Sequence, residues 1–244
     1  MLAISIVSHG QGDLVANLLR DLRPFLQPSV KVIVTLNIPE SEAFEAGPHV
    51  TFIRNEQPMG FGANHNQAFR SCRCDYFAVL NPDVRLDWRV FATILASVRP
   101  GIGVCAPQIR NSSGHIEDSA RTFPTLSDIA RRLSVRLQRK PLCSSYDVTG
   151  QGSIEVDWVA GMFMVFAGKA YADVGGFDEG YFMYLEDADI CYRLWRSGWK
   201  VTMTRDVYVT HDARRATFKS VQHLRWHVSS LIRFLLSHPR DLER

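Results

Sequence analysis

The residues best suited to chemistry are three carboxylates that follow a glycine pair and an aromatic segment. Glu186, Asp187 and Asp189 fall in the first turn of a predicted helix, 186–196, where the helix dipole stabilises negative charge. Acids cap many helices for this reason, and Asp189 and Arg193 have the spacing of an ordinary i,i+4 ion pair. Three acids directly behind Phe-Met-Tyr exceed what capping needs. We therefore expect at least one of them to face a cleft as a general base for a sugar hydroxyl.

Two further side chains have positions typical of cation ligands. Asp83 follows a buried strand and the rigid Asn81-Pro82 step, which holds the carboxylate outward. An aspartate there is usually a turn former, but at the ligand edge of a parallel sheet it also suits a divalent cation on a diphosphate. His211 follows the strand-like segment 207–210. A single histidine is more often packed or solvated, but this one would suit manganese if it completed a metal site.

A glycine-rich segment opens the predicted helix 61–72. Gly60 and Gly62 would let the backbone approach a ligand, and the N–H groups of a helix N-terminus would face it. The alternative is an ordinary glycine turn before a helix. The loop after the first strand, Ser8 to Gly12, does not have the G-x-G-x-x-G pattern, and no Walker motif occurs in the chain. A Rossmann dinucleotide site and a P-loop are both disfavoured.

The elements that must position these residues alternate through the first half of the chain. Hydrophobic periodicity predicts strands at 4–7, 30–36, 50–53, 76–80 and 104–106, and helices at 13–22, 61–72 and 88–98. This alternation predicts an α/β fold, a largely parallel sheet with helices on both faces. Ligands bind at the carboxyl ends of such strands. Those ends are Ser8, Asn37, Arg54-Asn55 and Asn81-Pro82-Asp83.

The second half is less regular. Residues 110–153 are rich in Ser, Arg and Gly and predict a long excursion with a helix near 126–137. Regular structure resumes at 156–166, and 199–203 predicts a strand. The tail has an apolar residue every three or four positions, which predicts an amphipathic helix. Its apolar side is expected to pack on the core, and the alternative is that it faces a lipid-linked acceptor at a membrane. Its apolar positions are Val221, Leu224, Val228, Leu231 and Leu235.

Composition excludes several classes of protein. The 244 residues are 46% hydrophobic with a net charge of +3, so the chain predicts a globular protein and not an electrostatic nucleic-acid binder. Basic residues cluster at 131–140 and 214–233, where they suit phosphates, an anionic membrane or plain solvent. The five cysteines show no zinc or C-x-x-C spacing, so we expect reduced, mostly buried thiols in the cytosol. No apolar run reaches transmembrane length, and no signal peptide is evident.

Taken in order, these segments resemble family 2 glycosyltransferases of the GT-A fold, and most closely their rhamnosyltransferase-like branch. The correspondence runs from Ile4 to about Leu235. Each motif is weak alone, but the ordered set is specific. The matching motifs are the Ile-Val-Ser strand ending at Ser8, Asn55 with Gly60-Phe61-Gly62 and Asn66, Asn81-Pro82-Asp83 in place of D-x-D, Val156 to Gly161 with Trp158, Gly175-Gly176-Phe177-Asp178, and Glu186-Asp187-Ala188-Asp189.

The resemblance implies inverting transfer of a sugar from a nucleotide diphosphate sugar. Asp187 would be the general base, and Asp83 and His211 would bind a divalent cation, Mg²⁺ or Mn²⁺, that bridges the diphosphate. The remaining substrate-binding positions would be Ser8, Asn37, Asn55, Gly60, Gly62, Asn66, Asn81, Trp158, Gly161 and Glu186. The chain would be one domain, with residues 1–107 binding the donor and 108–244 binding the acceptor.

The same resemblance suggests dTDP-L-rhamnose as donor, and a saccharide or lipid-linked saccharide of a cell-surface polysaccharide such as O-antigen as acceptor. The protein would be cytoplasmic. Peripheral contact with the inner face of the plasma membrane and a homodimer are both left open. Two departures bear on the substrates. Asn37 stands where relatives usually have the acid that reads the base, and His9-Gly10 stands where they often have an aromatic residue and Asn.

Two other functions fit parts of the pattern. A sugar-nucleotide pyrophosphorylase shares the α/β architecture, but its first loop carries basic residues, and Gly10 to Asp13 has none. A non-catalytic carbohydrate-binding relic of a transferase would account for the altered base-reading and D-x-D positions.

Overall fold

A computed structural model describes residues 1–40, 47–125, 146–211 and 221–238. The strands are β1 (Leu2–Ser8), β2 (Val30–Leu36), β3 (Val50–Arg54), β4 (Tyr76–Leu80), β5 (Val84–Arg85), β6 (Ile102–Arg110), β7 (Ala120–Arg121), β8 (Ser153–Glu155), β9 (Trp158–Val159), β10 (Phe163–Ala167) and β11 (Lys200–His211). The helices are α1 (Gly12–Leu22), α2 (Phe61–Arg70), α3 (Val90–Ser97), α5 (Gly168–Asp173), α6 (Glu186–Arg196) and α7 (Val221–Ser237), with a 3₁₀ turn η1 (Arg23–Phe25). The helix expected near 126–137 lies outside the described residues.

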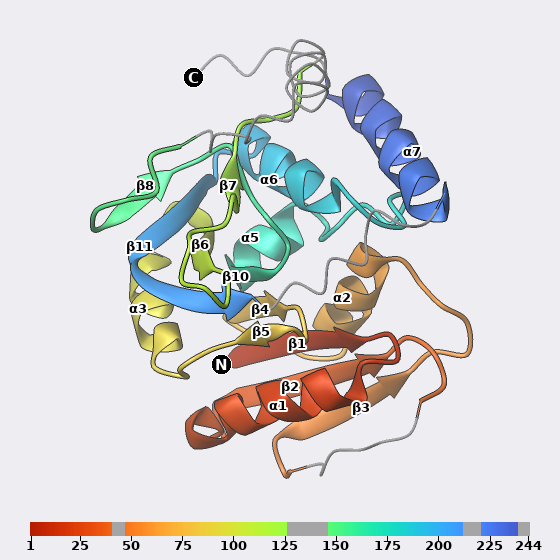
Figure 1. The fold of residues 1–244 in the computed structure, drawn as a ribbon, viewed down its shortest axis with the longest axis vertical. Helices are drawn as coiled ribbons and strands as arrows, with labels where there is room; N and C mark the ends of the chain where they lie inside the picture. The colour runs from red at the N-terminus through yellow and green to blue at the C-terminus, as the bar shows by residue number, and fades with distance from the viewer. Residues whose placement is uncertain (41–46, 126–145, 212–220, 239–244) are drawn as a thin grey trace.

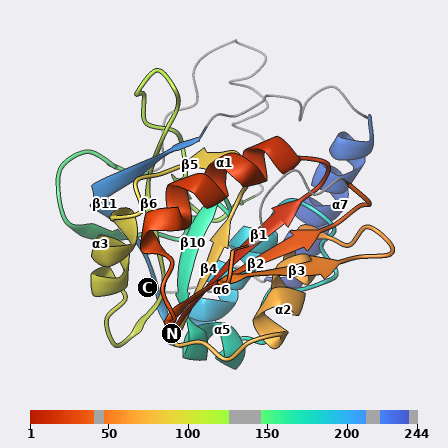
Figure 2. The same ribbon diagram turned by 90° about the horizontal axis from the view of Figure 1, so that it is seen from below.

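The N-terminal part of the main sheet is parallel, as the alternation of strands and helices predicts. The strand order across the sheet is β3-β2-β1-β4-β10-β6-β11-β5, and β8 pairs with β11. Strands β3, β2, β1 and β4 run parallel, with Ile4 opposite Val32 on one side and Ala78 on the other. Their arrowheads therefore end at one edge, on the side of the molecule where α7 lies (Figures 1 and 2). This edge carries Ser8, Asn37 and Asn81.

An antiparallel strand divides the sheet, which the sequence did not predict. β10 lies between β4 and β6 and runs antiparallel to both, so Phe163 at its start lies opposite Leu80 at the end of β4. β11 is one strand of 12 residues, longer than the predicted 199–203, with an irregular register between Thr204 and Tyr208. Its last residue, His211, lies opposite Val84 of β5. These two pairings bring late segments of the chain to the carboxyl end of β4.

Side chains alternate between two cores because successive residues of a strand point to opposite faces. Ile4 and Ile6 of β1 pack with α1 and α3, whereas Ala3 packs with α2, α5 and α6. Parallel strands covered on both faces are apolar throughout, and all residues of β1 except Val7 are buried. Helices therefore cover both faces, as predicted (Figure 2).

Core packing, the favoured alternative for the tail helix, was wrong for three of its five apolar positions. Helix α7 contacts the body through its polar and aromatic face, on which Ser230 and Phe234 are buried. Val221, Leu224 and Val228 are 77%, 64% and 49% exposed, whereas Leu231 and Leu235 are half-buried. The helix lies at the periphery beside α6 (Figure 1). No helix in the described part of the chain is long and apolar enough to cross a membrane.

The four described cysteines are free thiols. Cys105 and Cys191 are buried, and Cys72 and Cys74 are half-buried. The expected reduced state agrees with these four, and Cys143 lies outside the described residues.

Candidate active site

The site forms where β4 ends and β10 begins. The Asn81 N–H donates to the Met162 carbonyl oxygen (2.9 Å), which fixes the turn that leads into β10 beside the end of β4. One residue earlier in that turn, the Gly161 N–H donates to Oδ2 of Asp187 (2.9 Å) at the start of α6. The Asn81-Pro82-Asp83 segment and Asp187 are therefore joined through Gly161-Met162. Residues more than 100 positions apart in the sequence meet at one sheet edge.

Asp187 is a partly exposed carboxylate held by backbone groups. Oδ2 accepts the Gly161 N–H, and Oδ1 accepts the N–H of Ala188 (2.9 Å). Burial raises the pKa of Asp187, and these two hydrogen bonds and the positive charge of Arg121 oppose that rise. A carboxylate with a raised pKa is a better proton acceptor than an ordinary surface aspartate. Both oxygens keep lone pairs that can accept a proton.

The neighbouring acids have different environments. Glu186 is 6% exposed, and its Oε2 is buried with no hydrogen-bond partner among the described residues. Burial, followed by the negative charge of Asp187, raises the pKa of Glu186 well above its usual value. Asp189 instead pairs with Arg193 (2.6 Å) as its spacing predicts, and also with His238 (2.8 Å). Asp189 therefore anchors structure, and Asp187 faces the site.

The backbone before this cluster is strained. Tyr184 and Leu185 have φ values of 74° and 64°, in the left-handed region that non-glycine residues rarely adopt. Such conformations persist only where surrounding contacts enforce them, and they concentrate at functional sites. Here the Tyr184 hydroxyl lies 2.7 Å from Nδ1 of His223, and its ring stacks on His227 at 3.6 Å. Helix α7 therefore holds the segment that aims Glu186 and Asp187.

His211 joins two carboxylates at the opposite side of the site. Its Nε2 lies 3.2 Å from Oδ2 of Asp83, and its Nδ1 lies 2.9 Å from Oε2 of Glu117. Burial lowers the pKa of His211, but the hydrogen bonds and charges of Asp83 and Glu117 outweigh burial and raise it to about 8. The imidazole is therefore protonated at neutral pH in this arrangement. The pairing of β11 with β5 places His211 beside Asp83, the two residues expected to bind a cation.

The residues present fit a divalent cation. Oδ1 of Asp83 is buried and has no hydrogen-bond partner among the described residues, so a strong acceptor faces inward unsatisfied. His211 Nε2 lies next to the same carboxylate, and one oxygen plus one imidazole ligand suits manganese. No group of three His, Cys, Asp or Glu residues in the described part of the chain has metal-site geometry. A cation here would take its remaining ligands from substrate oxygens or water.

The asparagines expected to contact the donor form a network inside the protein. The Asn37 side chain accepts the Met59 N–H (2.8 Å) and donates to the Met59 carbonyl oxygen (3.0 Å). Asn55 donates to the side-chain oxygens of Asn37 (2.9 Å) and Asn64 (2.7 Å). Ser8 accepts the Gln11 N–H (3.1 Å). These polar groups fix the loop after β3 at the carboxyl edge of the sheet.

The sequence suggested that Gly60 and Gly62 let the backbone approach a ligand. In the structure both glycines lie against another loop of the protein, the 177–182 segment. A Cβ on Gly60 would lie 2.9 Å from the carbonyl oxygens of Tyr181 and Phe182, and a Cβ on Gly62 would lie 2.5 Å from Cβ of Phe177. Asn66 donates to the Phe177 carbonyl oxygen (2.8 Å) and accepts the Phe177 N–H (2.9 Å). Helix α2 therefore packs against and holds the 177–182 segment, which leads to Glu186 and Asp187.

Trp158, expected to bind substrate, is buried. It is 5% exposed, its indole N–H donates to the Thr122 carbonyl oxygen (2.9 Å), and the Arg121 guanidinium lies over its ring at 5.1 Å. Gly161 is restricted in another way, because a Cβ there would lie 3.3 Å from the Phe61 ring and 3.6 Å from Cβ of Asp187. Both positions are therefore filled by contacts within the protein.

Sequence reasoning missed Glu117 and gave no role to Arg121. Both lie in the irregular 110–153 segment. The Ala160 N–H donates to the Ser119 carbonyl oxygen (2.8 Å), and this hydrogen bond connects the segment to the site. The signal available was an acidic and a basic residue close together in this segment. Without the fold, no spacing rule connects Glu117 to His211, 94 positions later.

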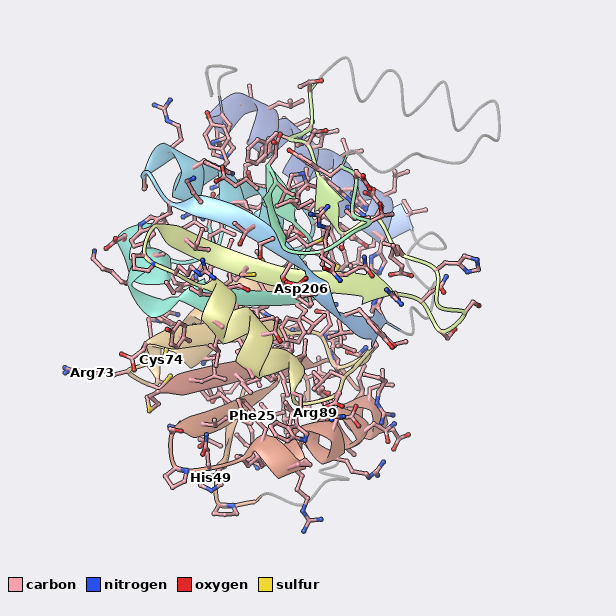
Figure 3. The ribbon with its side chains drawn as sticks, turned by 90° about the vertical axis from the view of Figure 1, so that its left-hand side faces the viewer. Phe25, His49, Arg73, Cys74, Arg89 and Asp206 are labelled. Atoms are coloured by element: carbon pink, nitrogen blue, oxygen red, sulfur yellow. The ribbon has the colours of Figure 1, made fainter. Side chains whose placement is uncertain are left out.

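Two surface hollows, of about 600 and 590 Å³, lie on another face, where Arg89 and Asp206 are labelled (Figure 3). Ion pairs line them, including Arg85 with Asp21 (2.6 Å). Neither hollow includes a residue of the site described above, and we assign no ligand to them.

Comparison with known proteins identifies the class. A model described as "Glycosyltransferase like family 2" matches residues 18–229. The rhamnosyltransferase WbbL of Escherichia coli (strain K12) is 31% identical over an alignment of 253 residues, which covers 96% of this chain and 92% of the relative. An N-acetylglucosaminyl-diphospho-decaprenol L-rhamnosyltransferase of Mycobacterium tuberculosis (strain CDC 1551 / Oshkosh) is 33% identical over 168 residues, covering 66% of this chain and 55% of that relative.

Solved structures share the fold at low identity. GalNAc-T7 with UDP, GalNAc and Mn²⁺ has a TM-score of 0.68 at 15% identity, covering 95% of this chain and 47% of that chain. The mannosyltransferase PcManGT from Pyrobaculum calidifontis, in complex with GDP-Man and Mn²⁺, has a TM-score of 0.60 at 14% identity, covering 95% and 64%. The chain thus spans about half the length of GalNAc-T7 and of the mycobacterial relative.

The fold is the GT-A fold of glycosyltransferases, a mostly parallel α/β sheet flanked by helices. This chain belongs to glycosyltransferase family 2 and is a glycosyltransferase, similar to known rhamnosyltransferases. The resemblance found in its motifs is confirmed.

Proposed function

We propose that this enzyme transfers L-rhamnose from dTDP-rhamnose, with inversion at the anomeric carbon, to a saccharide or lipid-linked saccharide in cell-surface polysaccharide synthesis. The names of two relatives support the sugar, and the name of the mycobacterial relative supports a lipid-linked diphosphate acceptor. The observation that carries the proposal is the junction of β4 with β10. It places Asp187 and the Asp83–His211 pair at one sheet edge, where such folds bind ligands.

The roles of the chain's own residues follow from their environments. The acceptor hydroxyl oxygen forms a bond to the anomeric carbon, its proton passes to Asp187, and the nucleoside diphosphate leaves with the electron pair of the broken C–O bond. The Gly161 and Ala188 N–H groups hold the Asp187 carboxylate in one orientation throughout. The raised pKa of Glu186, which is buried beside it, favours the neutral form and so limits the negative charge next to Asp187.

The donor's leaving group carries the negative charge that develops in the reaction, so the opposite side of the site needs positive charge. Asp83 and His211 are the residues that would hold Mg²⁺ or Mn²⁺ there, and Glu117 would orient His211 through Nδ1. A divalent cation so placed supplies Lewis-acid stabilisation of the diphosphate. Two of the structural neighbours are solved with Mn²⁺, which supports this assignment.

The test is Asp187→Asn. We expect transfer to fall roughly 10²–10⁴-fold, the range that a positioned general base contributes, while donor affinity changes little. Transfer is measured with radiolabelled dTDP-rhamnose and membrane lipid extract, and donor affinity by calorimetry. Asp173→Asn is the matched control, because Asp173 is a surface aspartate of α5 paired with Lys169 (2.8 Å). Unchanged turnover in the Asp187 variant would remove it as the base.

A further inference from the structure

The outer face of α7 is an apolar surface that the protein itself leaves uncovered. Val221, Leu224, Val228, Ile232 and Leu236 recur every three or four residues, so they form one row along the helix. They are between 49% and 80% exposed. The other large apolar side chains exposed in the described residues are scattered over different elements. We call this row the outer row of α7.

The helix is fixed on its other side, so the outer row does not reflect loose packing. The Ser230 hydroxyl donates to the Met183 carbonyl oxygen (2.9 Å), and Arg233 pairs with Asp178 (2.7 Å). Phe234 is buried and lies against the ring of Tyr192. These contacts hold α7 against the 178–184 segment and point the outer row away from the body.

The size of the outer row argues against a second copy of the chain as its partner. Five aliphatic side chains at these exposures present on the order of 300 Å² of apolar surface, from the usual area of about 60–120 Å² per side chain. A stable protein interface needs roughly 800 Å² on each partner. A single apolar row along a helix instead matches the way amphipathic helices lie in a lipid interface.

The charge of α7 favours an anionic lipid surface. The helix contains Arg225 and Arg233 and no Asp or Glu. Arg225 is exposed between Leu224 and Val228, with no ion-pair partner in the described part of the chain, and its long stem can reach lipid headgroups from there. The sequence directly before the helix adds Arg214, Arg215 and Lys219 against one acid, Asp212. Basic residues beside an apolar helix face attract anionic lipids.

We propose that the outer row of α7 docks the enzyme on an anionic bilayer. The inner face of the same helix holds Tyr184 and the segment that leads to Asp187, so docking presents the acceptor side of the site to the membrane surface. The inference deepens the proposed function, and rests on it only where it supposes a lipid-linked acceptor.

The experiment is co-sedimentation of the full chain with vesicles of phosphatidylcholine alone or with about one third phosphatidylglycerol, at low and high salt. We expect at least tenfold stronger binding to the anionic vesicles, weakened by salt because surface charges are screened.

The variant Leu224→Ser/Val228→Ser/Ile232→Ser should lose at least tenfold in binding. Arg225→Gln should lose preference for anionic vesicles and keep part of the total binding. Tyr208→Ser, which changes an exposed ring on β11, is the control and should bind as the native chain does.

Two results would overturn the proposal. One is equal sedimentation of the native chain and the triple variant with anionic vesicles. The other is a native dimer in sedimentation velocity that the triple variant abolishes, which would make a second copy the occupant. All variants change exposed positions, and circular dichroism checks that they fold. Vesicle binding needs no turnover, so it can fail while Asp187→Asn still behaves as the proposed function requires.

Discussion

Two adjacent carboxyl groups at the start of α6 have different surroundings, although burial raises the pKa of both. Glu186 points into the protein with an unpaired oxygen, whereas Asp187 accepts two backbone N–H groups and is partly exposed. Pairs of acids whose environments separate their pKa values divide acid and base roles in enzymes. The helix dipole alone, which the sequence suggested, would have kept all three acids of the cluster ionised.

Glu117 is expected to set the pH range in which the site binds a cation. His211 must lose a proton before Nε2 can bind Mn²⁺, so affinity should increase as pH rises through the His211 pKa of about 8. In Glu117→Gln one of the carboxylates that raise this pKa is gone, so the transition should shift toward 6.5. Loss of this orienting partner should also weaken Mn²⁺ binding about 10–100-fold above pH 8. The measurement is the free Mn²⁺ signal in electron paramagnetic resonance from pH 6.5 to 9.

Glu155→Gln serves as the matched control, because Glu155 is an exposed residue of β8 paired with Lys200. It should leave both affinity and midpoint unchanged. An identical pH midpoint in native protein and Glu117→Gln would show that Glu117 does not act on His211.

At the scale of elements, the segment between Gly175 and Leu185 is shaped by α2 and α7 together. Asn66 of α2 holds both backbone groups of Phe177, and α7 holds Tyr184. The glycines at the start of α2 are needed because the two backbones approach closely. The element that leads into Glu186 and Asp187 is therefore a loop held in a clamp between two helices.

Substitution of Gly62 should disturb this clamp. In Gly62→Ala the new Cβ would lie 2.5 Å from Cβ of Phe177, an atom near the backbone that cannot swing aside. We expect a loss of about 1–3 kcal/mol in the free energy of unfolding, partly offset by the better helix propensity of alanine. The melting temperature should fall by several degrees, roughly 2–4 °C per kcal/mol. Calorimetric melting of both proteins measures this.

Gly47→Ala is the comparison, since a Cβ there meets no atom within 4 Å. It should melt within a degree or two of the native chain. Equal melting temperatures for Gly62→Ala and the native chain would mean that the Phe177 segment moves freely, against the clamp described.

The elements themselves were predictable where one local rule decides them. Short apolar, β-branched runs located β1, β2, β3 and β4, and acids after an aromatic segment located the start of α6. The antiparallel β10 was not predictable, because a short apolar run between irregular segments carries no information about its neighbours or direction. The expectation that the apolar positions of the tail helix pack on the core failed for a related reason. Periodicity shows that a helix has an apolar face, but not that this face meets the core.

At the scale of the whole molecule, the site depends on long-range pairing. β10 next to β4 and β11 next to β5 bring Gly161 and His211 to Asp83, and no residue near Asp83 in the sequence announces either pairing. The ordered motifs predict that these residues share a site, because the family carries them in this order, and that remains a prediction. The role of Glu117 could not be found this way, since it lies in none of the motifs.

Nucleotide binding at the sheet edge should stabilise the whole fold, because a ligand that binds only the folded state raises the free energy of unfolding. At a concentration of 100 times its Kd, dTDP-rhamnose should add about 2.7 kcal/mol and raise the melting temperature by roughly 5–10 °C. The Asn37 amide is held by Met59, so base selection rests on other contacts and UDP-sugars serve as the discriminating comparison. The increase should be larger with Mn²⁺, and Asp83→Asn should remove the Mn²⁺ effect because it removes the cation's proposed carboxylate ligand. Thermal shift with dTDP-, UDP- and GDP-sugars measures this, and no increase with any of them would contradict a donor site at this edge.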